Sequence, residues 1–171
     1  MKRFIGIVAV AIIMAFVGQE VMSQNLKFGH INRNELIQAL PEFDSANVTL
    51  QKFQQELVNA LELMSVELNN KSDAFNKESK NLSDIVRQAK EGELIDLNRR
   101  IQEFQTNAQE QLQAKSAELF APITAKADKA IKDVGKENGF IYVFDQSTLV
   151  YFDETKSTNI MPLTKAKLGL K

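Results

Sequence analysis

The side chains able to do chemistry in this chain are few, and their spacing defines no catalytic or metal site. His30 is the single histidine and cysteine is absent, which excludes cysteine nucleophiles and cysteine-based zinc sites. The seven glycines form no phosphate-binding loop. Carboxylates such as Glu91 and Glu93 lie among many other charges, which is typical of a solvated surface. We therefore predict no enzymatic activity, no cofactor and no metal, and we expect His30 to be structural.

The charge balance excludes another class of function. The chain has 21 basic and 22 acidic residues, so its net charge is only −1. Nucleic-acid binding needs a clustered basic surface, which the sequence lacks. Outside a small basic group at Lys165, Lys167 and Lys171, the sequence gives no support for binding to a membrane surface. We expect membrane contact only indirectly, through bound partners.

The first residues predict export. Lys2 and Arg3 precede an apolar run from Phe4 to Val17, and Val21 and Ser23 suit the positions before a cleavage site. Residues 1–23 are therefore predicted to be a signal peptide that is cleaved near Ser23. An uncleaved membrane anchor is the alternative, but the apolar run is shorter than the ~20 residues that a spanning helix needs. Because no disulfide is available, stability must come from packing or assembly.

A long helical segment follows from Asp44 to Asn138. Its apolar residues recur at spacings of three and four, which is typical of helices packed side by side. We predict two antiparallel helices, each ~65 Å long, that form an arm. The reversal lies between Lys80 and Gly92. Ser83 is a plausible N-cap, whereas equal helix lengths favour Gly92, and the sequence leaves both open.

Two stretches of the arm have a weak apolar pattern. Asn69–Asp73 is polar throughout, and Gln105–Glu118 has glutamine or lysine where a strong helix–helix interface would have leucine or isoleucine. Pro122 removes a backbone donor and should bend the second helix. We expect low local stability along the distal arm.

Before the arm, the alternating residues Leu26 to Asn32 predict a strand. Asn32 or Asn34 should cap a short helix that Pro41 ends. Asp44 or Ser45 should then cap the first long helix.

After the arm, the apolar period changes to two. Phe140–Phe144 and Thr148–Phe152 are predicted to be strands on either side of a turn, which together make a β-hairpin. Asp153–Asn159 is expected to be a loop, and a terminal helix should open at Pro162 and stop at Gly169. Gly139 or Asn138 is expected to end the arm in a left-handed conformation.

The fold class predicted is α+β, with the arm at 44–138 attached to a small β-body at 24–43 and 139–171. The short strands are too few to bury a core in one subunit, so we expect the body to assemble with other copies. The predicted residues of this shared core are Phe28, Ile31, Ile141, Val143, Phe144, Leu149 and Tyr151.

Four apolar residues lie near the reversal of the arm, namely Phe75, Leu82, Ile85 and Val86. One interpretation is that they pack together and close the arm tip. The other is that they contact a non-native chain bound by the arm.

Several stretches resemble the Skp (OmpH-like) family of periplasmic chaperones. They are LKFGHIN at 26–32, ENGFIYVFD at 137–145, LVY at 149–151, NIMPL at 159–163 and KAKLG at 165–169. The resemblance implies a homotrimer whose β parts form one shared barrel in the periplasm, with arms that enclose unfolded outer-membrane proteins. Relatives commonly have an Asp-Ile-Thr type triplet where this chain has Asn159-Ile160-Met161. Several relatives have a basic cluster on the return helix that is proposed to bind lipopolysaccharide. Arg99-Arg100 is the only basic pair in the return helix of this chain, so we carry over no lipopolysaccharide site.

Two functions compete. The first is an ATP-independent holdase chaperone that binds unfolded outer-membrane proteins. The second is a structural or adaptor coiled coil of the cell envelope. A structural coiled coil that tethers envelope components should have a sustained heptad pattern and a retained anchor. The weak mid-arm pattern and the predicted signal cleavage therefore favour the chaperone.

Overall fold

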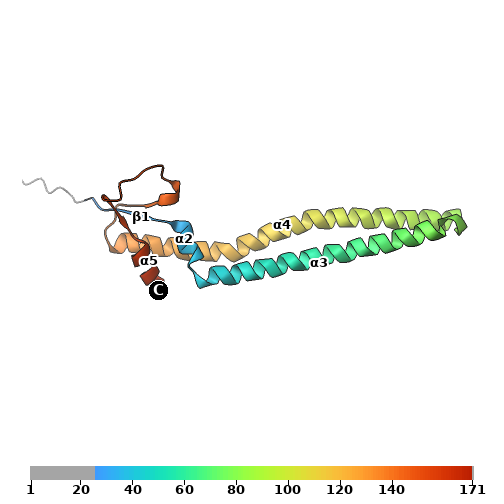
Figure 1. The fold of residues 1–171 in the computed structure, drawn as a ribbon, viewed down its shortest axis with the longest axis horizontal. Coiled ribbons are helices and arrows are strands. Elements are labelled where there is room, and N and C mark those ends of the chain that lie inside the picture. Colours follow the sequence, from blue (N-terminus) through green and yellow to red (C-terminus); the bar gives the residue numbers. More distant parts are fainter. Residues whose placement is uncertain (1–25, 171) are drawn as a thin grey trace, which may run out of the picture.

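The computed structural model describes residues 26–170, and the predicted signal peptide at 1–23 lies outside the described residues. The elements in chain order are β1 (Phe28–Ile31), α2 (Arg33–Gln38), α3 (Pro41–Glu78), η1 (Ser79–Asn81), α4 (Asp84–Glu137), β2 (Tyr142–Asp145), η2 (Gln146–Thr148), β3 (Ser157–Asn159) and α5 (Met161–Lys167). The strands and short helices gather at one end, and α3 and α4 project from it as a long antiparallel pair (Figure 1). The predicted α+β class, with long helices and a small sheet, is confirmed.

The two arm helices have unequal lengths. α3 has 38 residues and α4 has 54, which correspond to ~57 Å and ~81 Å. The chain reverses at η1, and Ser83 is the N-cap residue of α4, while Gly92 lies inside that helix. A reversal at Gly92 would require two helices of equal length. The lengths differ because α4 continues beyond the arm into the body.

The start of α2 lies where the sequence predicts it, whereas the start of α3 does not. The side chain of Asn32 caps α2 by accepting a hydrogen bond from the Glu35 amide at 3.1 Å, as predicted. The expected start of α3 at Asp44 or Ser45 is wrong. Pro41 occupies the first turn instead, where its missing N–H costs nothing, and Leu40 is the N-cap residue.

The predicted hairpin does not form. β1 lies in the centre of the three-stranded sheet, between β2 and β3, and both pairings are parallel. Residues 149–152 form no strand, whereas Ser157–Asn159, expected to lie in a loop, form β3. The physical reason is the turn at η2. There the side chain of Asp145 accepts from the Ser147 amide at 3.1 Å, and the chain leaves β2 to return on the far side of β1.

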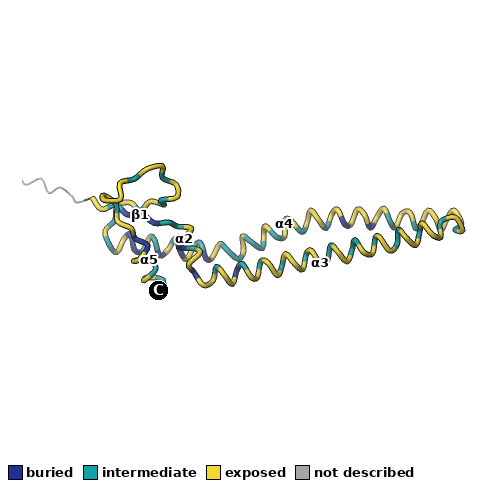
Figure 2. Tube along the Cα trace, in the orientation of Figure 1, coloured by how far each residue is buried: buried dark blue, intermediate teal, exposed yellow. Residues whose placement is uncertain are grey.

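A hydrophobic core lies within the single subunit. It joins the fully buried Ile31, Leu36 and Ile160 of the body to Ile123 and Ala127 of α4. Figure 2 shows the buried residues concentrated at this end of the molecule. The strands alone are too few to bury a core, as expected, but α4 supplies a wall of the body and so completes one.

Two glycines in the body occupy constrained positions. A Cβ on Gly29 would lie 3.1 Å from Cγ2 of Ile160, so a side chain there would require the Ile160 side chain to shift by a few tenths of an ångström. Gly139 has φ of 68°, the left-handed conformation expected after α4. It turns the chain from the helix into β2.

The middle of the arm has no buried residues on α4. Leu97 and Ile101 are buried near the tip and Ile123 begins the buried stretch of the body, but no residue between Ile101 and Ile123 is buried. A groove of about 340 Å³ opens between α3 and α4 in this region. The weak pattern predicted for Gln105–Glu118 thus corresponds to a loosely packed interface.

We expect amide hydrogen exchange to follow this packing. Amides in 105–118 should exchange faster than those in 123–134 of the same helix, because local opening there exposes little apolar surface. Mass-spectrometric exchange on the intact protein measures the difference. Equal protection along α4 would contradict a loose mid-arm and favour a rigid spacer.

Candidate binding surfaces

His30 is a structural residue in this fold. Its side chain is 7% exposed, Nδ1 lies 2.9 Å from Oγ of Ser157, and the ring packs 4.6 Å from that of Phe152. These contacts join β1 to β3 and to the loop before it. Among residues 26–170, no cluster of three or more histidine, cysteine or acidic side chains has the geometry to hold a metal. The predicted structural role of His30 agrees with these contacts.

One face of the sheet carries an aromatic row that the subunit leaves largely uncovered. Parallel register places Phe28 beside Tyr142 and His30 beside Phe144. The rings of Phe28 and Tyr142 are stacked with centroids 6.2 Å apart, and Tyr142 and Phe144 are 5.8 Å apart. Tyr142 remains 58% exposed and Phe144 41% exposed. We call Phe28, Tyr142 and Phe144 the aromatic face.

The other predicted residues of the shared core divide into two groups. Ile31 is 1% exposed and Val143 packs against the core of its own subunit, so both serve the fold of the single chain. Ile141 and Tyr151 are exposed, and Leu149 is half-buried. Side-chain alternation places Ile31 and Val143 on the face toward α4 and the aromatic face on the opposite side. Ile141 is exposed at the pocket between β2 and α4, and Leu149 and Tyr151 lie outside the strands.

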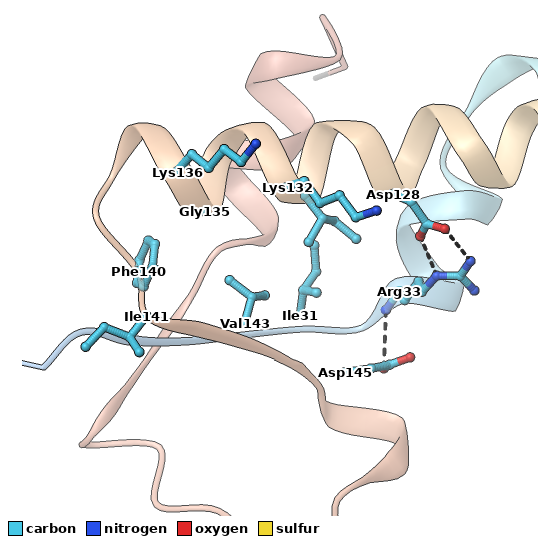
Figure 3. A pocket seen from close by; sticks show the side chains of 11 residues that line it. Ile31, Arg33, Asp128, Lys132, Gly135, Lys136, Phe140, Ile141, Val143 and Asp145 are labelled. Atoms are coloured by element: carbon cyan, nitrogen blue, oxygen red, sulfur yellow. Dashed lines mark hydrogen bonds and ion pairs between the residues drawn. The ribbon is translucent and has the colours of Figure 1, made fainter.

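A pocket of about 400 Å³ lies between β2 and α4. Figure 3 shows Val143 and Ile31 on its floor, with Lys132 and Lys136 of α4 above them. Arg33 closes one end, donating from Nε and Nη2 to Asp128 at 2.6 and 2.9 Å. Its backbone N–H also faces Asp145. The pocket is therefore apolar inside and ionic at its rim.

The ion pair between Arg33 and Asp128 makes the stability of the body depend on pH in the acidic range. The hydrogen bonds from Arg33 hold the pKa of the Asp128 carboxyl below its ordinary value, against the opposing effect of burial. Burial tends to raise the pKa of Asp145, but the hydrogen bonds from Ser147 and the hydrogen bond and positive charge of Arg33 together lower it.

We expect Asp128→Asn to lower the free energy of unfolding at pH 7 by about 1 kcal/mol or less, because the pair is partly exposed. A depressed folded-state pKa stabilises the protein above the unfolded value of about 4, and this contribution disappears as the pH falls below it. The urea stabilities of variant and parent should therefore converge below about pH 4. Asp73→Asn, on the exposed arm surface, serves as the control. A constant difference at every pH would contradict the role of this pair.

At the arm tip, the four candidate residues do not behave alike. Phe75 and Leu82 are half-buried, and Phe75 lines a small groove with Glu93 and Leu94 of α4. Ile85 is 83% exposed and Val86 is 42% exposed. The structure thus partly buries two of them and leaves two open to solvent.

Sequence reasoning missed other exposed apolar residues on the arm. Leu63 on α3 is 72% exposed and Ile95 on α4 is 70% exposed. Each stands next to an interface residue, Met64 or Leu94, and so points away from the partner helix. The sequence signal that could have identified them is that both are apolar residues outside the three-four spacing of the helix–helix interface.

Across the residues that the structure describes, none of the helices has the length and apolarity needed to cross a membrane. The described residues combine a long helical hairpin with a small α+β body and exposed apolar side chains on both. This architecture offers extended apolar surfaces on both the arm and the body.

The family follows from a direct comparison. Residues 27–168 match the model of the family described as Outer membrane protein (OmpH-like). The chain therefore belongs to the OmpH-like family, which is periplasmic and whose members are chaperones and not enzymes. A search of curated proteins gave no match.

Proposed function

We propose that this protein is an ATP-independent periplasmic holdase, which binds unfolded outer-membrane proteins between its helical arms and prevents their aggregation. The main support for the proposal is that large apolar side chains are exposed along an arm that carries no arrangement of catalytic side chains. Leu63, Ile85 and Ile95 are each at least 70% exposed. Exposed apolar groups along such an arm offer contacts to the apolar segments of a non-native chain.

The proposal includes a homotrimer joined through the body. The aromatic face leaves apolar surface uncovered on one side of the small sheet, and Ile141 is exposed at the pocket between β2 and α4. Association removes such surface from water. Three arms from one body would surround a space between helices of ~57–81 Å. That space suits an unfolded small domain, whose dimensions are of the same order.

Binding in this scheme is the sum of many weak contacts. The sequence has no phosphate-binding loop, so nucleotide hydrolysis has no place in the cycle, and release follows when the client folds or inserts elsewhere. Membrane contact is indirect, through the client. The proposal requires the purified protein to suppress aggregation of an unfolded outer-membrane protein without nucleotide.

The structural or adaptor coiled coil remains the second candidate, and one observation favours it. Ion pairs connect the two arm helices close to the tip, between Lys71 and Glu93 and between Lys90 and Glu78. Such pairs favour a defined arm geometry. The unburied stretch of α4 between Ile101 and Ile123 favours the chaperone, because a spacer gains from continuous packing.

We expect Ile85→Ala to weaken client binding only modestly, by a factor of about five or less, since most residues of an extended interface contribute under about 1 kcal/mol. The dissociation constant of a fluorescently labelled, urea-unfolded outer-membrane protein measures this. Gln88→Ala at the same tip is the matched control and should have no effect.

Combining Ile85→Ser with Leu63→Ser and Ile95→Ser should weaken binding further and roughly additively, because the three sites are far apart along the arm. A complete loss from Ile85→Ala alone would indicate one dominant pocket and contradict the distributed mode of binding.

A further inference from the structure

The groove in the middle of the arm, between α3 and α4, has an apolar floor and an uncharged rim. Its apolar lining residues are Leu57, Val58, Leu61, Phe104, Ala108 and Leu112. The other residues that line it are three glutamines, Gln54, Gln105 and Gln109. Val58 is 49% exposed, so part of the apolar surface is in contact with water. The groove thus offers apolar surface without a single charged side chain among its lining residues.

Two other grooves of the arm are charged. The groove near the tip is lined by Lys71, Lys90 and Glu93, and the groove at the arm base is lined by Glu42 and Lys126. These charges form ion pairs that join α3 to α4. The middle of the arm differs, because its groove is open and its walls carry amides in place of ion pairs.

The glutamines of the rim belong to longer rows of uncharged residues. Spacings of three, four and seven residues keep side chains on one side of a helix. On α3 the row consists of Gln51, Gln54, Val58, Ser65, Asn69 and Ser72. On α4 it consists of Ile95, Asn98, Gln102, Gln105, Gln109 and Gln113. Members of both rows line the same groove, so the rows border it together. We call these two rows the uncharged side of the arm.

Charged residues that join the helices point elsewhere. Glu93, which pairs with Lys71, comes two residues before Ile95. Two residues turn the direction of a helical side chain by about 200°, so Glu93 and Ile95 point to nearly opposite sides of α4. Ile95 is 70% exposed. The uncharged side therefore presents an open apolar residue as well as the groove.

The chemistry of this surface selects its ligand. A glutamine amide both donates and accepts hydrogen bonds, as do the backbone N–H and C=O groups of a polypeptide. In a chain that has not folded, those backbone groups have no fixed partners. A charged segment would lose water over the apolar floor and gain no opposite charge there.

We propose that the groove and the uncharged side of the arm bind an extended, uncharged segment of a non-native polypeptide in which apolar and polar residues alternate. The inference rests on the proposed holdase function and specifies which segments the arm recognises and where. Successive side chains of an extended chain point in opposite directions. Its apolar side chains enter the groove, and its backbone exchanges hydrogen bonds with the amides of Gln54, Gln105 and Gln109.

Two short labelled peptides with blocked ends test the class of ligand. In the first, phenylalanine or valine alternates with serine or threonine, and in the second the polar positions are aspartate. We expect the intact protein to bind the first at least about tenfold more tightly. Added salt should not weaken this binding, because no ion pair is there to be screened. Equal affinity for the two peptides, or no binding of the first, would overturn the inference.

A matched pair of variants tests the position. Gln109→Glu should weaken binding of the uncharged peptide at least about fivefold, because it places a carboxylate at the rim of the groove. Gln111→Glu makes the same change two residues further on, where the side chain points to nearly the opposite side of α4, and should have no effect. Both glutamines are exposed, so circular dichroism should be unchanged. Equal weakening by the two variants would overturn the assignment of the groove.

The absence of cysteine from the chain allows the same position to be tested with a whole client. Gln109→Cys and Gln111→Cys are each labelled with benzophenone maleimide, mixed with a urea-unfolded outer-membrane protein on dilution, and irradiated. We expect the label at 109 to capture the client several times more often than the label at 111.

The possible failures are distinguishable. Suppression of aggregation with equal capture at 109 and 111, or capture of a second copy of the chain in place of the client, would overturn the inference and leave the holdase proposal standing. Selective binding of the uncharged peptide without suppression of aggregation would support the ligand class of the groove and contradict the holdase.

Discussion

Phe144→Glu should convert the protein to monomers and abolish its ability to hold an unfolded client. Phe144 lies on the aromatic face, 41% exposed in the single subunit and outside its hydrophobic core. A carboxylate there costs the subunit little, but in a trimer it would be buried without a partner. Leaving a charge unpaired at a buried site costs about 3–5 kcal/mol, and each of three equivalent contacts would suffer.

Light scattering measures the mass, and circular dichroism shows whether the subunit is folded. Ile85→Glu at the arm tip is the matched control, which should leave the mass unchanged. The milder Phe144→Ala should shift the population toward monomers at low concentration, with a cost of about 3–5 kcal/mol for a fully buried ring. Assembly of Phe144→Glu as stable as that of the parent at micromolar concentration would contradict a trimer built on the aromatic face.

The second large effect is expected from Leu36→Ala. Leu36 is 0% exposed and packs in the core that joins the body helices to α4. Removing a buried leucine side chain typically costs about 2–5 kcal/mol, a large part of the roughly 5–15 kcal/mol that stabilise a domain. We expect the midpoint of urea unfolding to fall accordingly.

Leu63→Ala is the control for this prediction, because it makes the same change at a side chain that is 72% exposed. Its effect should stay within about 0.5 kcal/mol. Both variants must be compared at one protein concentration, since assembly contributes to apparent stability. Equal destabilisation by the two would show that the core identified in the body does not support the fold.

The sequence predicted what local patterns determine. The three-four spacing identified both arm helices, Asn32 capped α2 as expected, and Ser83 was one of two proposed starts of α4. The left-handed Gly139 followed from the helix stop before it. These features depend on residues a few positions apart.

Features that depend on distant pairing were predicted poorly. Phe140–Phe144 was recognised as a strand, but its partner is β1, more than a hundred residues earlier, and not the next apolar run. Alternation shows that a strand has two faces but not which face meets α4. For this reason Ile31 and Val143 were assigned with Phe144 to a shared core, although they pack inside the subunit.

Only part of the candidate client surface at the arm tip was predicted from the sequence, and the reason is related. Ile85 and Val86 are exposed near the tip, whereas Phe75 and Leu82 are half-buried there. Spacing alone does not separate these pairs, because the chain changes direction at η1 and the helical phase is lost there. The exposure of Leu63 and Ile95 became apparent only once the helix–helix interface was defined.

The central claim is that the protein holds unfolded outer-membrane proteins. The most direct measurement dilutes a urea-unfolded outer-membrane β-barrel protein into buffer with the mature protein at about three chains per client, without nucleotide, and follows light scattering. We expect aggregation to be suppressed by the parent and not by Phe144→Glu. Unchanged aggregation in the presence of the assembled parent would contradict the holdase and make the structural coiled coil the better explanation.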